Sequence, residues 1–221
     1  NVQVTDAGIG ATALAINEEA ESLDGPVTLD IGGGLIAAGS SSTGASLTRT
    51  STEELTAEAV AITVDDFLAA TAEDATGLEI ELTTENGTGS VALSVGEDDE
   101  TDGGLYVEGD LATGGDIRVV SESGATGSVV ATIDGSVTVI GEAATGLLID
   151  GEAGTAAGAV TTEFTGTLGV NGIDARGLVV DLEAGTSAGA VTTDIAGNVT
   201  TEGDGSTAVD IIVDAEDAAG A

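Results

Sequence analysis

The sequence contains no cysteine, lysine, histidine, methionine or tryptophan, and each absence removes a kind of chemistry. Without cysteine, the chain can form neither a disulfide framework nor a thiolate metal site. Its cationic side chains are three scattered arginines, Arg49, Arg118 and Arg176. Hydrolysis can proceed on paired carboxylates alone, but pairs such as Asp65 and Asp66 are plentiful here because acidic residues are plentiful. We therefore expect that the protein is not an enzyme and that it needs no organic cofactor.

Aromatic residues and proline are almost missing, and they are Phe67, Tyr106, Phe164 and Pro26. Any core must therefore be thin and built from aliphatic side chains. Apolar residues still make up 41% of the chain, which argues against the disorder that high charge and few aromatics often signal. No apolar run approaches the roughly 18 residues that span a bilayer, so we expect no direct membrane insertion. The chain opens at Asn1 in a strand-like sequence, so we expect any signal peptide to have been removed.

Negative charge dominates the sequence, with 40 acidic side chains against three basic ones and a formal net charge of −37. We expect such a surface to repel nucleic acid and anionic lipid headgroups. It must also attract counterions, so cations are expected partners in a saline or divalent-rich setting. Two interpretations remain open: a solvated face that resists aggregation, or selective binding of cations.

The strongest pattern is an internal repeat. Residues Glu152–Leu182 align without gaps on Glu183–Val213, with 12 of 31 positions identical. A fixed period of this length indicates one supersecondary unit that stacks on its neighbour to bury an apolar face, as in solenoid proteins.

A four-residue phrase, in which small residues precede an aliphatic strand, recurs along the whole chain. Between the third residues of successive phrases the spacings are 31, 33, 27, 23, 19, 31 and 31 positions. The eight phrases begin at Ala11, Ser42, Ala75, Asp102, Ala125, Ala144, Ala175 and Ser206. Together they predict about seven coils of roughly 19–33 residues.

Within a unit, apolar and polar residues alternate, as at Leu78, Ile80 and Leu82. This period of two is typical of strands. Turns such as Asn86-Gly87 and Asp134-Gly135 separate the segments, because glycine accepts the positive φ of a tight corner. We therefore predict an all-β fold, a single elongated parallel β-solenoid, or β-helix. The alternative is a β-sandwich subunit with a donated strand.

The predicted solenoid forms a single domain over residues 1–221. One stretch departs from the pattern: residues 51–72 are rich in alanine and glutamate, with Leu55, Ala59 and Ile62 on one helical face. We consider a short inserted helix there as an alternative to a regular coil.

Two phrases carry a resemblance to a known family: the segments 135–149 (GSVTVIGEAATGLLI) and 197–211 (GNVTTEGDGSTAVDI). They resemble the repeats of bacterial autotransporter-type passenger domains, which are β-helical secreted surface and adhesin proteins. The resemblance covers residues from about Gly103 to the end. It implies export to the cell surface and a role in adhesion, matrix or fibre formation.

One acidic loop resembles part of a calcium site. Asp98, Glu100 and Asp102 have the alternating spacing of calcium ligands before the turn at Gly103, and Glu108 lies one residue before the position expected for a bidentate glutamate. We name these four acidic residues as candidate Ca²⁺ ligands, and a plain solvent-exposed loop is the alternative.

The terminal segments predict self-association. Residues 1–6 (NVQVTD) and 208–214 (AVDIIVD) both have strand character, and the end of a solenoid exposes unpaired backbone groups. Pairing between the ends of two copies would satisfy both edges. The candidate self-assembly residues are Val2, Val4, Val209, Ile211, Ile212 and Val213.

The expected function is therefore a non-enzymatic structural subunit of an extracellular surface filament or matrix, which assembles head to tail as a homopolymer. One alternative is an adhesin stalk segment that displays binding loops. Another is a calcium-dependent acidic matrix protein.

Overall fold

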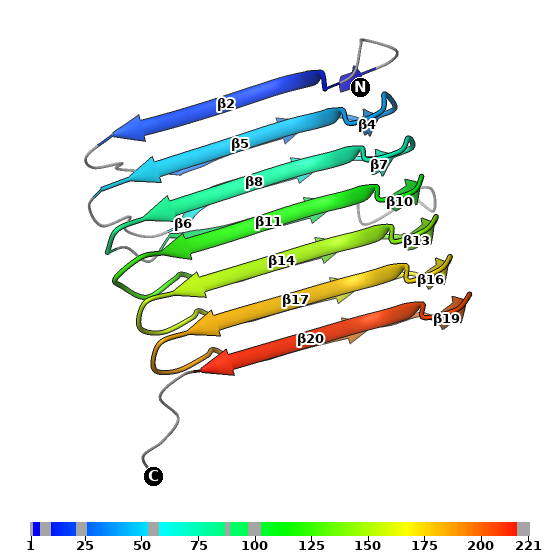
Figure 1. Ribbon diagram of the computed structural model, residues 1–221. Coiled ribbons are helices and arrows are strands. Elements are labelled where there is room, and N and C mark those ends of the chain that lie inside the picture. The colour runs from blue at the N-terminus through cyan, green and yellow to red at the C-terminus, as the bar shows by residue number, and fades with distance from the viewer. Residues whose placement is uncertain are drawn as a thin grey trace.

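The computed structural model describes residues 2–4, 10–20, 26–52, 58–86, 89–96 and 103–215. Throughout these ranges every helix or strand assigned is a β-strand, and the strands form parallel sheets of seven, seven and six members. Each sheet takes every third strand, so the chain visits the three sheets in turn and forms six full coils and part of a seventh (Figure 1). The expected all-β solenoid is confirmed. The β-sandwich alternative is wrong, because sandwich strands pair in antiparallel fashion.

The three sheets are named A, B and C in the order in which the chain meets them. Sheet A contains β1 (Val2–Val4), β4 (Leu35–Ala37), β7 (Phe67–Ala70), β10 (Gly104–Glu108), β13 (Ser136–Ile140), β16 (Leu168–Asn171) and β19 (Val199–Glu202). Sheet B contains β2 (Thr12–Ala20), β5 (Thr43–Ser51), β8 (Thr76–Thr84), β11 (Thr113–Ser121), β14 (Thr145–Ala153), β17 (Arg176–Ala184) and β20 (Thr207–Ala215). Sheet C contains β3 (Val27–Ile31), β6 (Glu58–Val64), β9 (Ser90–Val95), β12 (Val129–Ile133), β15 (Val160–Phe164) and β18 (Val191–Ile195).

The pairing register confirms the repeat found in the sequence. Glu152 pairs with Glu183, and Leu182 pairs with Val213, as the alignment of the two segments predicts. The first residues of the sheet B strands follow one another at intervals of 31, 33, 37, 32, 31 and 31.

The predicted range of coil lengths was too short, because two of the eight phrases belong to other corners. The phrase at Asp102 leads into β10 of sheet A, and the phrase at Ala125 precedes β12 of sheet C. The fourth unit instead begins at Thr113, which pairs with Thr76. Small residues recur at more than one corner, so the phrase alone does not identify its place in a coil.

The described residues of the stretch 51–72 follow the solenoid and form strands, with no helix among them. Within it, β6 pairs with β3 and β7 pairs with β4, and residues 53–57 lie outside the described part. Alanine and glutamate tolerate a strand here because stacking on neighbouring coils overrides local propensity. In the described residues, no helix is long and apolar enough to cross a membrane.

The core is a set of aliphatic columns, one side chain per coil. Leu47, Ile80, Ile117 and Ile149 occupy one column of sheet B and are each no more than 1% exposed. Phe164, from sheet C, is the largest of the fully buried side chains. Removing apolar surface of this kind from water contributes about 25 cal/mol per Å², so stacking of coils is the main source of stability.

Glycine permits the coils to approach one another at the corners. A Cβ atom added at Gly146 would overlap the carbonyl oxygen of Gly177 in the next coil, and Gly114 stands in the same relation to Gly146. The turn position three residues before these glycine positions needs positive φ in every coil, and glycine occupies it in the first and last coils, at Gly10 and Gly205. In the five coils between, Ser41, Asp74, Leu111, Ala143 and Asp174 adopt the same left-handed conformation.

Candidate assembly surface and acidic face

The last coil leaves aliphatic side chains uncovered. β20 is an edge strand of sheet B, and in the described residues no strand lies beyond it (Figure 1). Ile211 is 44% exposed, whereas Val180, its partner one coil earlier, is 0% exposed. Val213 is 47% exposed and its partner Leu182 only 2%. These side chains have the inward orientation of core residues but lack the coil that would cover them.

The structure separates the predicted self-assembly residues into two groups. Val209, Ile211 and Val213 share the inward column positions, and Val209 packs partly against the core. Ile212 pairs with Asp181 on the outer face instead, because side chains alternate along a strand. The remaining two candidates, Val2 and Val4, lie in β1, the edge strand of sheet A in the first coil. This is the opposite end of the solenoid from β20.

At the opposite edge of sheet B, a charged pair takes the place of apolar residues. Arg49 is 2% exposed and lies in the inward column that Leu82 continues. Its Nε lies 2.8 Å from a carboxylate oxygen of Glu18 in β2, whose side chain is 40% exposed. Sequence analysis did not identify this pair, although Arg49 is in phase with the buried Leu47.

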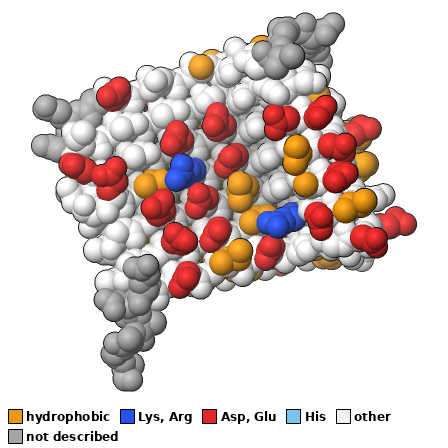
Figure 2. Space-filling model, in the orientation of Figure 1, with side chains coloured by type: hydrophobic (Ala, Val, Ile, Leu, Met, Phe, Trp, Pro, Cys, Tyr) orange, Lys and Arg blue, Asp and Glu red, His pale blue; other side chains and the backbone are white. Residues whose placement is uncertain are grey.

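The outer face of sheet B carries most of its side-chain charge as carboxylates (Figure 2). Acidic residues occupy outward positions in strands from β2 to β20, and two arginines lie among them. The acidic residues are Glu19, Glu79, Glu81, Asp116, Asp150, Glu152, Asp181, Glu183, Asp210 and Asp214.

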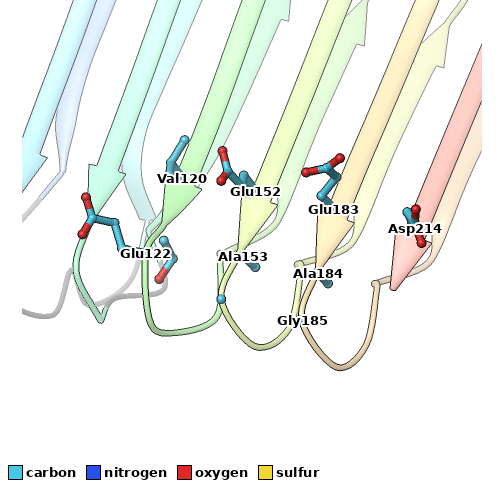
Figure 3. Close-up of a pocket in the computed structure, with 10 residues that line it drawn as sticks. Val120, Glu122, Glu152, Ala153, Glu183, Ala184, Gly185 and Asp214 are labelled. Carbon is cyan, nitrogen blue, oxygen red and sulfur yellow. The ribbon is translucent and has the colours of Figure 1, made fainter. Parts of the chain in front are cut away.

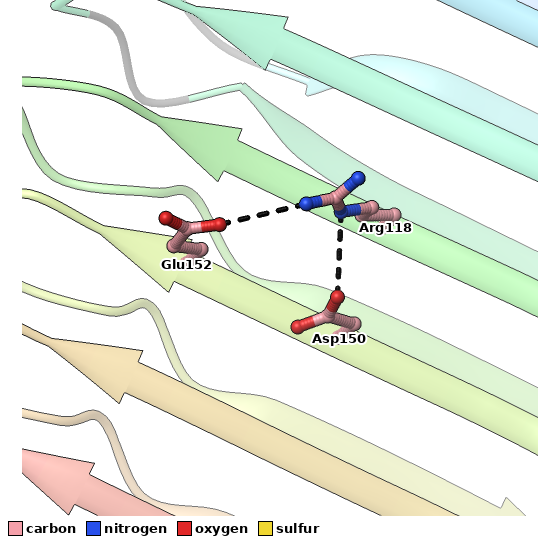
Figure 4. Close-up of polar contacts among 3 residues, drawn as sticks. All are labelled: Arg118, Asp150 and Glu152. Carbon is pink, nitrogen blue, oxygen red and sulfur yellow. Dashed lines mark ion pairs between the residues drawn. The ribbon is translucent and has the colours of Figure 1, made fainter.

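Arg118 lies in β11, the fourth of the seven strands of sheet B, and contacts two carboxylates of the next coil (Figure 4). Its Nε lies 3.3 Å from Asp150, and one of its terminal nitrogens lies 3.5 Å from Glu152. All three side chains are at least 39% exposed, so each contact contributes less than about 1 kcal/mol.

Two carboxyl groups near Arg118 hold their protons more tightly than usual. Partial burial, followed by repulsion from Glu79 and Asp150, raises the pKa of Asp116 to about 6. Partial burial also raises the pKa of Asp150, although the positive charge of Arg118 opposes the shift. This part of the acidic face therefore changes its charge in mildly acidic solution.

Arg176 also forms an ion pair with the next coil. Its guanidinium lies 3.7 Å from a carboxylate oxygen of Asp210 in β20.

The acidic residues also line an open hollow of about 430 Å³ along the ends of four strands (Figure 3). Glu152, Glu183 and Asp214 follow one another in adjacent strands, and Glu122 completes the acidic edge. Like charges directly opposite one another destabilise a sheet. Repulsion along this edge is therefore strongest at low ionic strength. Across the described ranges, no group of three or more carboxylates could hold a metal ion.

The predicted calcium ligands are only partly within the described structure. Asp98, Glu100 and Asp102 lie outside it. Glu108 is exposed at the end of β10 and accepts a 2.7 Å hydrogen bond from the hydroxyl of Tyr106. This hydrogen bond is the largest cause of the raised pKa of Tyr106. Among the candidates, Glu108 alone is placed, and its described contact is to a side chain of its own strand.

Comparisons of the chain with protein-family models, curated proteins and solved structures find no match.

Proposed function

We propose that the protein is a non-enzymatic structural subunit of an extracellular surface filament or matrix, and that copies assemble head to tail by pairing their end coils. The observation that carries this proposal is the inner face of the last coil, where Ile211 and Val213 are 44% and 47% exposed. A further coil would bury both side chains and pair the free backbone edge of β20.

The charge pattern favours a high-salt setting for this assembly. Association brings two highly acidic surfaces together, and repulsion between them opposes contact at low ionic strength. At about 1 M salt the Debye length falls to about 3 Å, which leaves the apolar contact between end coils to dominate. An extracellular location fits both this requirement and the resemblance to passenger repeats.

Sedimentation and electron microscopy in high salt test the proposal, with two substitutions at neighbouring positions. Ile211→Asp places a charge on the inner face of the end coil and should abolish filaments. Ile212→Asp is the matched control, because Ile212 is 47% exposed on the outer face and its replacement should leave filaments intact. Strictly monomeric wild-type protein at high salt, or equal effects of the two substitutions, would contradict the proposal.

A second candidate function, an adhesin stalk that displays binding loops, is favoured by one corner of the third coil. Gly103 lies close to Gly96, since a Cβ added at Gly103 would be 3.1 Å from the Cα of Gly96. The coil is also the longest, since Thr76 pairs with Thr113 at an interval of 37. Deleting residues 97–102 should leave filaments unchanged in either case and should remove cell adhesion only if this candidate is right.

A calcium-dependent matrix protein is separated from both by thermal unfolding. A ligand that binds only the folded state raises the melting temperature, and the rise grows with the logarithm of the ligand concentration once that exceeds Kd. A rise with millimolar calcium at constant ionic strength would support this role, whereas an unchanged melting temperature would remove it.

A further inference from the structure

We infer that the junction between two copies keeps the register of the coils, with β20 of one copy against β2 of the next and Thr207 opposite Thr12. This inference rests on the proposed head-to-tail assembly and adds the alignment of the two edges. Both edge strands are nine residues long, and each occupies one edge of sheet B.

The inward columns match in this register. Val209 would lie on Leu14, and Ile211 on Ile16. Leu14 and Ile16 are partly buried and pack against the core, as Val209 does. The aliphatic columns of sheet B would therefore continue across the junction.

The corners match in the same register. Gly205 and Gly10 hold corresponding places before β20 and β2, with φ angles of 73° and 82°. Stacking with Thr207 on Thr12 places one left-handed corner on the other, as in successive coils within the chain. A slip of two residues keeps the inward alternation but separates these corners. A slip of one residue turns every apolar side chain of β20 away from the core.

At one inward position of this register an apolar residue would meet a carboxylate. The ion pair between Glu18 and Arg49 explains how this contact is tolerated. Val213 would lie on Glu18, whose carboxylate would then lose solvent. Arg49 lies on the other side of Glu18, with only 3% of its side chain exposed, and keeps its 2.8 Å contact when the outer side is covered. The carboxylate is therefore buried with its counter-charge in place, which avoids the cost of an isolated buried charge.

The outward columns explain why the junction needs salt. Asp214 would face Glu19, and like charges directly opposite destabilise a sheet. Asp210 would face Ala15, and Ile212 would face Asn17, so the other two outward positions bring no like charges together.

Cysteine cross-linking tests the register directly, because the natural chain contains no cysteine. Two double variants place thiols opposite one another in the proposed register: Asn17→Cys with Ile212→Cys, and Ala15→Cys with Asp210→Cys. Two control variants exchange the partners and are offset by two residues: Asn17→Cys with Asp210→Cys, and Ala15→Cys with Ile212→Cys. Paired strands lie about 4.8 Å apart, within the Cα separation of a disulfide, whereas diagonal neighbours at about 7–8 Å exceed it.

The four variants are assembled in high salt under reducing conditions, oxidised, and separated on denaturing gels. We expect ladders of covalent multimers from the two in-register variants, formed at least about tenfold faster than from the two offset variants. Two in-register pairs are used so that one substitution that prevents assembly does not decide the result.

Filaments without faster cross-linking of an in-register pair would overturn the register and leave the proposed assembly standing. Faster cross-linking of an offset pair would have the same meaning. Absence of filaments in the wild-type protein and all four variants would overturn both the register and the assembly.

Discussion

The guanidinium of Arg49 lies inside the solenoid, with its Nε 2.8 Å from a carboxylate oxygen of Glu18 in the preceding coil. One coil further along, the same inward column is filled by Leu82, which is 0% exposed. An apolar column therefore ends in an ion pair at one edge of sheet B and in the exposed Val213 at the other. The two ends of the stack differ in chemistry, which favours head-to-tail contact over pairing of like ends.

Replacing Arg49 alone should destabilise the protein. Arg49→Leu extends the aliphatic column but leaves the Glu18 carboxylate facing it without a counter-charge. We expect a loss of about 1–3 kcal/mol, below the 3–5 kcal/mol of a fully buried pair, because the Glu18 side chain is 40% exposed. The double variant Glu18→Leu/Arg49→Leu should regain most of this loss. Urea unfolding of the single and double variants measures the difference, and equal stability of both would contradict the prediction.

Asp116 should make stability depend on pH. Its pKa of about 6 in the folded protein lies above the ordinary value of 3.8, so the folded state binds more protons than the unfolded state between these values. Stability therefore falls as the pH rises from about 4 to about 6. Two pKa units correspond to about 2.7 kcal/mol, which solvent screening of this partly exposed group reduces to about 1 kcal/mol.

The variant Asp116→Asn isolates this effect. It should melt at a higher temperature than the wild type at pH 7.5, and the two should converge near pH 4. Glu163→Gln removes the same charge from an exposed site on sheet C and controls for the change in net charge. The same pH profile in both variants would show that Asp116 has no special part in it.

Glycine at the crowded corner should be irreplaceable, and glycine on an open face should not. Gly146→Ala forces a Cβ against the backbone of the next coil, and we expect it to cost about 1–3 kcal/mol. Gly169 is the matched control, because the nearest atom to an added Cβ there is 3.6 Å away. Gly169→Ala should be neutral or stabilise the protein by up to about 1 kcal/mol. Thermal melting of the two variants compares them, and similar losses in both would refute the steric account.

Leu111 occupies the left-handed corner with a φ of 59°, and its side chain is 58% exposed. A left-handed conformation costs about 1–2 kcal/mol for a residue other than glycine. Leu111→Gly should therefore stabilise the protein by about 0.5–1 kcal/mol, after the entropy that glycine loses on folding is subtracted. Ala112→Gly, at the adjacent buried position, should destabilise it. Unfolding midpoints in urea measure both changes, and a lower midpoint for Leu111→Gly would contradict the argument.

Prediction from the sequence was most accurate where the repeat was regular. The alignment of residues 152–182 on 183–213 matches the pairing of Val160 with Val191 and of Leu168 with Val199. It was least accurate in the middle of the chain. There similar phrases of small residues precede strands of all three sheets. The third coil is also six residues longer than the repeat, with 37 residues between Thr76 and Thr113 against 31 in the regular coils.

For the candidate site, too, some features could be predicted from the sequence and others could not. The aliphatic character of Ile211 and Val213 was enough to name them as end-coil residues, and alternation along the strand assigns Ile212 to the other face. The raised pKa of Asp116 could not be predicted, because it depends first on burial by the stacked coils and then on Glu79 one coil before and Asp150 one coil after.

The amino-acid sequence alone determined the strands, the solenoid and the 31-residue period, because alternation, glycine turns and repetition are local patterns that each coil carries within itself. The three-dimensional structure was needed to show which residues of different coils become neighbours outside the aligned repeat of residues 152–213. Arg49 meets Glu18, and Arg118 meets Asp150 and Glu152, because loop lengths between strands set the register. Contacts across the stack depend on that register, and no single coil encodes it.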